Sequence, residues 1–219
     1  MARISQNTIA EAAAAAGTPS TIAASTTVGD GTAEDTKLVF DGNALDFRVG
    51  IDDGTDKLEI GKGNAHGTTT HMTLDGDGIM NMPLQPAAYC HLSANQSVND
   101  NTWTKAAMAS EEYDQNNDMD LTNYKFVAPV DGLYLCTMTG GYHMDTDKLI
   151  GVSIRKNGTE VLRSLQFTGG TNHHQVPLVG ILKLDASDYL EWYWLHNFGS
   201  ADNVTGSKEY SYAMTQLLA

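Results

Sequence analysis

An acidic segment in the middle of the chain has the residue types and spacing of a cation-binding loop. Oxygen-bearing side chains recur in it at alternate positions: Asp114, Asn116, Asp118 and Asp120. Several converging carboxylate and amide oxygens are what Ca²⁺ prefers. Two positions depart from the twelve-residue calcium loop, because Met119 stands where its sharp turn needs glycine and Lys125 where it needs glutamate. We therefore favour a solvated acidic loop; calcium is the one candidate cofactor, and the sequence otherwise predicts none.

Histidines form a second group that could ligate a metal ion. Imidazole nitrogens bind zinc, and the candidates are His143, His173, His174 and His196. Adjacent residues of a strand point to opposite faces, so at most one of His173 and His174 can face a given site. We favour hydrogen bonding at the surface or at an interface between chains.

The sequence contains no recognisable catalytic motif. It has no nucleophile-elbow serine, no phosphate-binding Gly-Lys-Ser/Thr loop and no His-Glu-x-x-His. The carboxylate pair Glu111–Glu112 could hydrolyse a glycan. Trp103, Trp192, Tyr193 and Trp194 could stack on a sugar, but alternation places Tyr193 on the opposite face from Trp192 and Trp194, and one of these faces is expected in the core. We predict that the protein is not an enzyme.

Composition excludes some partners. The chain has 13 basic and 27 acidic residues, a net charge of −14, whereas phosphate binding needs clustered Lys and Arg. We expect no nucleic-acid partner. The apolar run at residues 12–16 is too short for a signal peptide or a membrane span, so we expect no membrane insertion. Cys90 and Cys136 are predicted to be buried thiols rather than a disulfide framework.

Residues 1–28 are predicted to form an arm. The segment is rich in Ala, Thr and Ser and has too little bulky apolar surface to fold alone. Residues 5–16 could form a short helix that stops at Gly17. We expect this arm to lie against another subunit or a larger assembly, because its own contacts could not offset the entropy of ordering it.

Residues 29–86 are predicted to form a β shaft. Short apolar-alternating runs are closed by Gly or Asp-Gly turns about every ten residues; the runs are 37–40, 45–49, 57–60, 71–74 and 79–82. Strands with one or two large apolar residues each cannot make a self-sufficient core. We expect three chains to stack these strands around a common axis, with a shared interior of Phe40, Phe47, Ile51, Ile60 and Leu74.

The shaft also resembles a known class of sequences. Segments 39–53, 57–63 and 73–78 look like shaft segments of bacteriophage fibre and appendage proteins. This resemblance implies a virion protein that projects from the particle.

Residues 87–219 are predicted to form an all-β head. Candidate strands are 88–92, 103–108, 125–127, 133–139, 149–156, 160–167, 176–184, 189–196 and 210–218. Asn157-Gly158 predicts a two-residue type I′ hairpin turn. Strands at this spacing imply a jelly roll or sandwich. The predicted core residues are Phe126, Gly132, Tyr134, Cys136 and Met138.

The spacing of Phe126, Gly132 and Tyr134 resembles the signature of the C1q/TNF-like trimeric jelly-roll heads, as do the 182–190 strand-turn-strand unit and the last strand. Together, the sequence predicts a non-enzymatic homotrimeric virion protein, anchored to a capsid or tail protein through residues 1–28. Its head would decorate the particle or bind a host-surface glycan or protein. The alternatives are a secreted C1q/TNF-like binding module and a glycan-cleaving tailspike.

Overall fold

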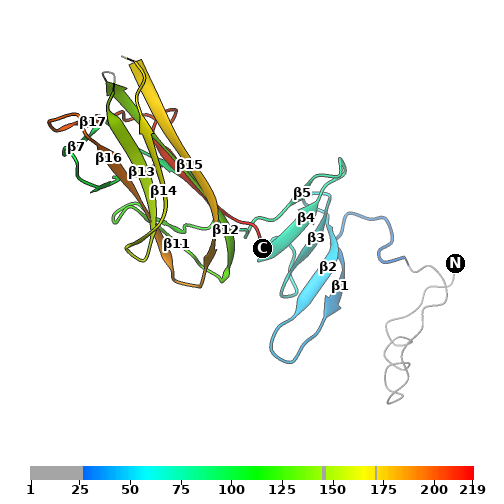
Figure 1. Ribbon diagram of the computed structural model, residues 1–219. Coiled ribbons are helices and arrows are strands. Elements are labelled where there is room, and N and C mark those ends of the chain that lie inside the picture. Colours follow the sequence, from blue (N-terminus) through cyan, green and yellow to red (C-terminus); the bar gives the residue numbers. More distant parts are fainter. Residues whose placement is uncertain (1–26, 145–146, 171) are drawn as a thin grey trace. The chain divides into compact units, whose positions relative to one another are not determined.

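The computed structural model describes residues 27–144, 147–170 and 172–219 (Figure 1). All regular secondary structure in these residues is β, as eighteen strands, which confirms the all-β class. The chain divides into two compact units, residues 1–81 and 82–219. We call the described part of the first (27–81) the N-terminal unit and the second the head. The helix expected over residues 5–16 lies outside the described residues, as does the arm up to residue 26.

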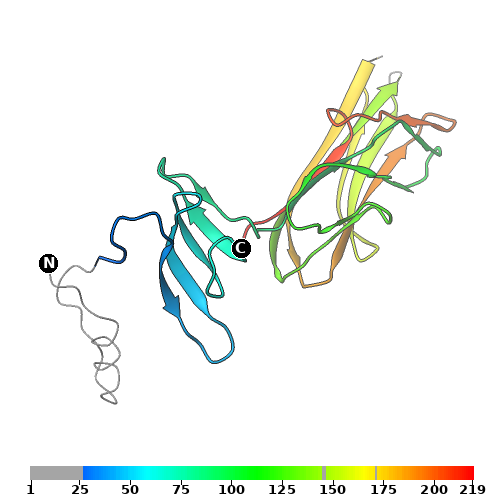
Figure 2. The ribbon, with the colours of Figure 1, turned by 180° about the vertical axis from the view of Figure 1, so that it is seen from behind.

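The N-terminal unit is one five-stranded antiparallel sheet. Its strands follow one another in space in chain order, as Figures 1 and 2 show from opposite sides. They are β1 (Thr36–Phe40), β2 (Phe47–Asp52), β3 (Lys57–Lys62), β4 (Thr70–Leu74) and β5 (Met80–Asn81). Such a meander follows from short alternating runs separated by Gly- and Asp-rich turns.

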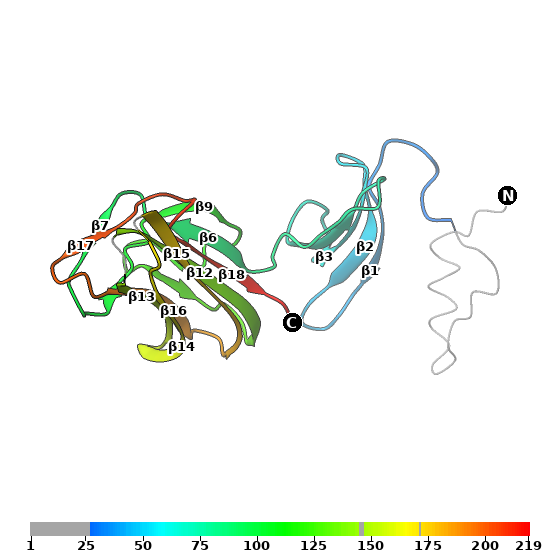
Figure 3. The same ribbon diagram turned by 45° about the horizontal axis from the view of Figure 1, so that its top comes forward.

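The head is a jelly roll of two antiparallel sheets. One sheet places β6 (Ala87–His91), β18 (Tyr212–Leu217), β12 (Gly132–Met144) and β15 (Asn172–Leu184) side by side (Figure 3). The other places β11 (Lys125–Val127), β16 (Tyr189–His196), β13 (Leu149–Lys156) and β14 (Thr159–Phe167) side by side. If these eight principal strands alone are numbered along the chain, from 1 for β6 to 8 for β18, their order in space is 1-8-3-6 in the first sheet and 2-7-4-5 in the second. Two interlocked Greek keys give this order.

The core of the head lies between the two sheets. Alternate residues of β12 point into it, so Tyr134, Cys136 and Met138 are buried together with Phe126. Gly132 lies where the C-terminus closes on β12, since an added Cβ would be 2.4 Å from Cδ1 of Leu217. Both cysteines are buried and unpaired, as expected, and burial raises the pKa of the Cys136 thiol to about 12.

The turn at Asn157-Gly158 is confirmed. It joins β13 to β14 with two residues, at φ of 50° and 80°, the positive values that a type I′ turn requires. Ser187, in the turn between β15 and β16, also takes a positive φ of 74°. Its turn is held by Asp188, whose carboxylate accepts hydrogen bonds from the amide of Asp185 and from Asn157 Nδ2.

Some expected strands differ from the structure. The segment expected at 103–108 is a strand only at β8 (Thr104–Lys105). Four strands were not expected: β7 (Gln96–Val98), β9 (Ser110–Asp114), β10 (Met119–Asp120) and β17 (Asp202–Val204). These strands are short or polar, so no apolar alternation marks them, and long-range pairing with the principal strands positions them.

Candidate functional site

One face of the N-terminal sheet is entirely apolar at its centre. Residues directly opposite each other in an antiparallel pair share a face, and the register places Leu38 opposite Val49, Val49 opposite Ile60 and Ile60 opposite Met72. We call this surface the apolar face. Its ten members are Leu38, Phe40, Phe47, Val49, Ile51, Leu58, Ile60, Met72, Leu74 and Met80.

Nothing within residues 27–81 covers the apolar face. None of its ten side chains is buried, and Leu38 and Phe40 are 55% and 62% exposed. In residues 27–81 the only buried residues are Arg48, Glu59 and Gly61. The N-terminal unit therefore has no hydrophobic core of its own.

The five predicted shaft residues all belong to this face. Phe40, Phe47, Ile51, Ile60 and Leu74 point to the same side of the sheet, and their role in a trimer interior stays a prediction. Five further members were not singled out: Leu38, Val49, Leu58, Met72 and Met80. The hairpin registers could have identified them, because each turn fixes which residues of the next strand share a face.

The opposite face of the sheet holds a buried ion pair. The Arg48 guanidinium donates to the Glu59 carboxylate, and also to the carbonyl oxygens of Gly63 (3.2 Å) and Thr68 (2.7 Å). Gly61 lies beneath the guanidinium, since an added Cβ would be 2.6 Å from Arg48 Nη2. The loop between β3 and β4 thus folds over the pair and removes it from water.

Hydrogen bonding sets the charge state of Glu59. Burial acts to raise its pKa, but the hydrogen bonds from Arg48 and from the Gly67 amide outweigh burial, so the pKa lies below its ordinary value. The side chain of His66, whose residue as a whole is half-buried, is only 1% exposed, and its Nδ1 lies 3.5 Å from Glu59 Oε1. Glu59 therefore stays ionised inside the unit.

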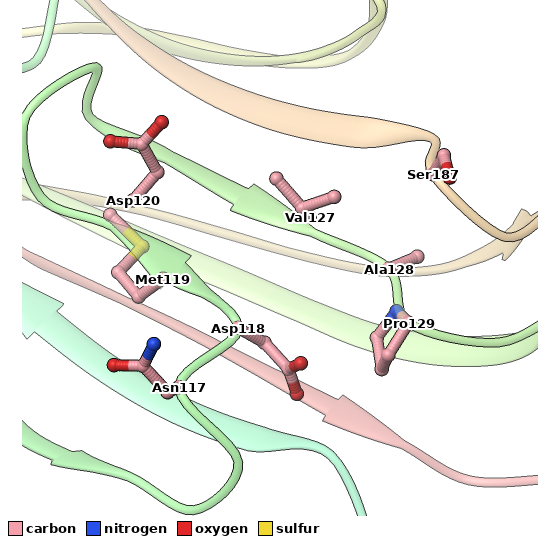
Figure 4. A pocket seen from close by; sticks show the side chains of 8 residues that line it. All are labelled: Asn117, Asp118, Met119, Asp120, Val127, Ala128, Pro129 and Ser187. Atoms are coloured by element: carbon pink, nitrogen blue, oxygen red, sulfur yellow. The ribbon is translucent and has the colours of Figure 1, made fainter.

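The structure does not bring the predicted calcium ligands together. The Asp114 carboxylate accepts hydrogen bonds from the amides of Asp118 and Met119, Asn116 Nδ2 donates to the Leu84 carbonyl, and Asp120 accepts from the 122 and 123 amides. Figure 4 shows the carboxylates of Asp118 and Asp120 pointing in different directions. Within the described residues, no group of three or more His, Cys, Asp or Glu side chains could hold a metal ion. The acidic segment is a loop braced by its own carboxylates.

Asp118 borders a surface cavity of about 470 Å³, shared with Met119, Pro129 and Ser187 (Figure 4). Burial, with a smaller contribution from the charge of Asp114, raises the pKa of Asp118 to about 6. Its Oδ2 is buried and has no hydrogen-bond partner among the described residues. Ionised Asp118 is therefore a source of local instability.

We expect Asp118→Asn to stabilise the head at neutral pH. The folded protein holds the Asp118 proton more tightly than the unfolded chain does, so the contribution of this group to stability falls as pH rises from the unfolded value towards about 6. After a discount for partial solvent exposure, the gain at pH 7 is about 1 kcal/mol. Thermal unfolding at pH 7 and pH 3.5 measures it, and a gain that persists unchanged at pH 3.5 would contradict the explanation.

Of the histidines and tryptophans singled out in the sequence, His174, His196, Trp192 and Trp194 are engaged by the fold itself. His196 is buried, with Nε2 2.9 Å from the Val98 carbonyl oxygen, and His174 Nε2 lies 2.9 Å from the Gly170 carbonyl oxygen. Trp192 and Trp194 are buried in the core. They are therefore unavailable for sugar stacking, unlike half-buried Trp103 and Tyr193.

A second apolar surface lies on the outer side of the head sheet that contains β12. Leu133 on β12 and Val179 and Ile181 on β15 are exposed there. Leu135, directly opposite Ile181, is half-buried. The two long strands thus present a continuous apolar strip to solvent.

Comparisons with known proteins find neighbours only among solved structures. No family model and no curated protein matches the chain. Among the part of the chain that the structure describes, no helix is long and apolar enough to cross a membrane.

The neighbours are TNF and C1q jelly-roll domains of low sequence identity. Eiger TNF from S. frugiperda matches 62% of this chain and 93% of its own, at 15% identity and a TM-score of 0.49. Murine APRIL at pH 5.0 matches 61% of this chain and 99% of its own, at 12% identity and a TM-score of 0.49. The globular domain of zebrafish complement 1qA protein matches 62% of this chain and 98% of its own, at 14% identity and a TM-score of 0.46.

Proposed function

We propose that this chain is a non-enzymatic, homotrimeric structural protein of a virus particle. Residues 1–28 would attach it to a capsid or tail protein, the N-terminal unit would form a three-chain shaft, and the head would stand at the particle surface. There the head would decorate the particle or bind a host-surface glycan or protein. The observation that carries self-association is the apolar face, which the rest of residues 27–81 leaves uncovered.

Burial of the apolar face by other copies of the chain is the simplest way to stabilise the N-terminal unit. Contiguous exposed apolar surface is unfavourable in water. The sheet also has two open edge strands, β1 and β5, and open edges invite pairing with other chains. A closed ring of sheets would cover both the face and the edges, whereas a face-to-face pair would leave the edges open.

The width of the sheet fits a ring of three. Five strands about 4.8 Å apart span about 19 Å, and three such sheets arranged as a triangle would each lie about 5.5 Å from the common axis. That distance is close to half of the roughly 10 Å between packed sheets. Side chains from three copies would then meet at the axis without leaving a channel.

The virion assignment is supported by the sequence of the shaft and by the arm. The shaft segments resemble those of bacteriophage appendages, and the Ala/Thr/Ser-rich arm precedes them. The secreted C1q/TNF-like module is the second candidate, and the jelly-roll strand order of the head supports it equally. A glycan-cleaving tailspike would release reducing sugar from host polysaccharide, and Glu111–Glu112, exposed on β9, are the carboxylates to test for it.

Deletion of residues 1–28 should leave a folded trimer but abolish its incorporation into particles, because the arm is the proposed anchor. Particles produced with the full-length and the truncated chain can be compared by mass spectrometry, and cryo-electron microscopy locates the protein on capsid or tail. Incorporation of the truncated chain at the normal level would refute the anchor. Absence of the full-length chain from both capsid and tail would refute the virion role.

A further inference from the structure

Two histidines lie directly opposite each other at one end of the β12–β15 pair. The register pairs His143 with His173, and their ring centroids are 4.9 Å apart with an interplanar angle of 68°. The ring of Tyr210 stacks on that of His173, with centroids 5.1 Å apart and an angle of 27°. The pair stands on the outer side of the sheet, and both residues are exposed.

The nitrogens of this pair are not used by the fold. Within the described part of the chain, no hydrogen bond or ion pair engages either ring. The other three histidines of the head differ in this respect: His91 lies 3.4 Å from Glu112, and the ring nitrogens of His174 and His196 lie against backbone carbonyl oxygens. His143 and His173 thus combine proximity, exposure and free ring nitrogens.

We propose that His143 and His173 bind a divalent transition-metal ion, with Zn²⁺ as the representative case. Side chains directly opposite in an antiparallel pair have Cβ atoms about 4.5–5.5 Å apart, and a zinc ion lies about 2.0–2.1 Å from each imidazole nitrogen. The exposed His143 ring can rotate about χ1 and χ2 until one of its nitrogens points at an ion held by His173. Imidazole is also a good ligand for Cu²⁺ and Ni²⁺.

The surroundings favour such an ion. The chain carries a net charge of −14, so a cation is attracted by the overall field. Stacking on Tyr210 restrains the His173 ring, which lowers the entropy lost when the ion binds. Two protein ligands leave the other positions of a tetrahedral shell to water. The ion is then bound reversibly, and the site does not depend on the function proposed above.

Isothermal titration of the untagged full-length chain with zinc chloride tests the site. We expect one ion per chain. His143→Asn and His173→Phe should each weaken binding at least about tenfold, because even loss of an outer-shell partner typically costs a metal site 10- to 100-fold in affinity. The phenylalanine keeps a ring against Tyr210 while it removes both nitrogens, so it separates ligation from packing.

His174→Asn is the matched control. His174 neighbours His173 in the chain but points to the other side of the strand, so its replacement should leave zinc affinity unchanged. Circular dichroism checks that every variant keeps its β-sheet signal. Three results would overturn the proposal: no heat of binding up to millimolar zinc, binding that survives the double variant His143→Asn/His173→Phe, or equal loss in the His174→Asn control.

Discussion

Leu38→Asp should dissociate the trimer into monomers, whereas Val39→Asp should leave it intact. Leu38 belongs to the apolar face, and Val39, the next residue, points to the opposite side of the sheet, where its partner is Arg48. In the proposed trimer, Leu38→Asp would put a carboxylate from each chain into an apolar interior, at a cost on the order of 3 kcal/mol per chain. Each such increment raises the dissociation constant by more than tenfold.

Light scattering coupled to gel filtration, over a concentration series, measures this effect. Leu38 is 55% exposed in a single chain, so its replacement does not itself disrupt the fold of a monomer. Ile60→Asp, at the centre of the face, should act in the same direction and more strongly. A wild-type chain that stays a folded monomer at micromolar concentration would refute the shared interior. If the wild-type protein is a dimer, the result would still support self-association through the apolar face. It would refute the threefold arrangement.

Arg48→Met should lower the stability of the N-terminal unit by about 3–5 kcal/mol. The substitution leaves the Glu59 carboxylate buried without its main partner, and an uncompensated buried charge is costly. It also removes the hydrogen bonds that hold the loop between β3 and β4 to the sheet. Chemical denaturation of the wild-type and variant chains at pH 7 gives the difference.

The double variant Arg48→Met/Glu59→Leu is the comparison that identifies the cause. When both charges are replaced by apolar groups, no buried charge is left unpaired, so much of the loss should be recovered. Failure of the double variant to recover would show that the loop contacts, rather than the unpaired charge, dominate. Low pH should also destabilise the N-terminal unit. The pKa of Glu59 is lower in the folded protein than its ordinary value, so the stability that ionised Glu59 contributes is lost as the pH falls through the pKa of the folded state.

Alternation with period two predicted the long strands well because it reports a local property. A strand half-buried on one side must alternate, and β13 and β16 have the bounds expected from their sequence. The same rule correctly predicted that Trp192 and Trp194 share a face, and the structure identifies that face as core. It also placed the five shaft residues on one side of the sheet.

Features that depend on distant segments were not visible to the same reasoning. The burial of Arg48 and Glu59 depends on the loop from Gly63 to Thr68, whose contacts with them no local pattern reports. The cross-strand pair of His143 and His173 needed the register of β12 with β15, set by 13 paired residues. The acidic segment was ambiguous because an aspartate that ligates calcium and one that braces a turn have the same spacing.

The lack of buried apolar side chains in residues 27–81 also bears on how the protein is made. The head has a complete core, so a newly synthesised chain can fold it alone. In the proposed trimer, the N-terminal sheet would gain its hydrophobic stabilisation when copies meet, so its folding would be a reaction of higher order in protein concentration. In the proposed trimer, the head would therefore fold first and the N-terminal sheet would assemble last.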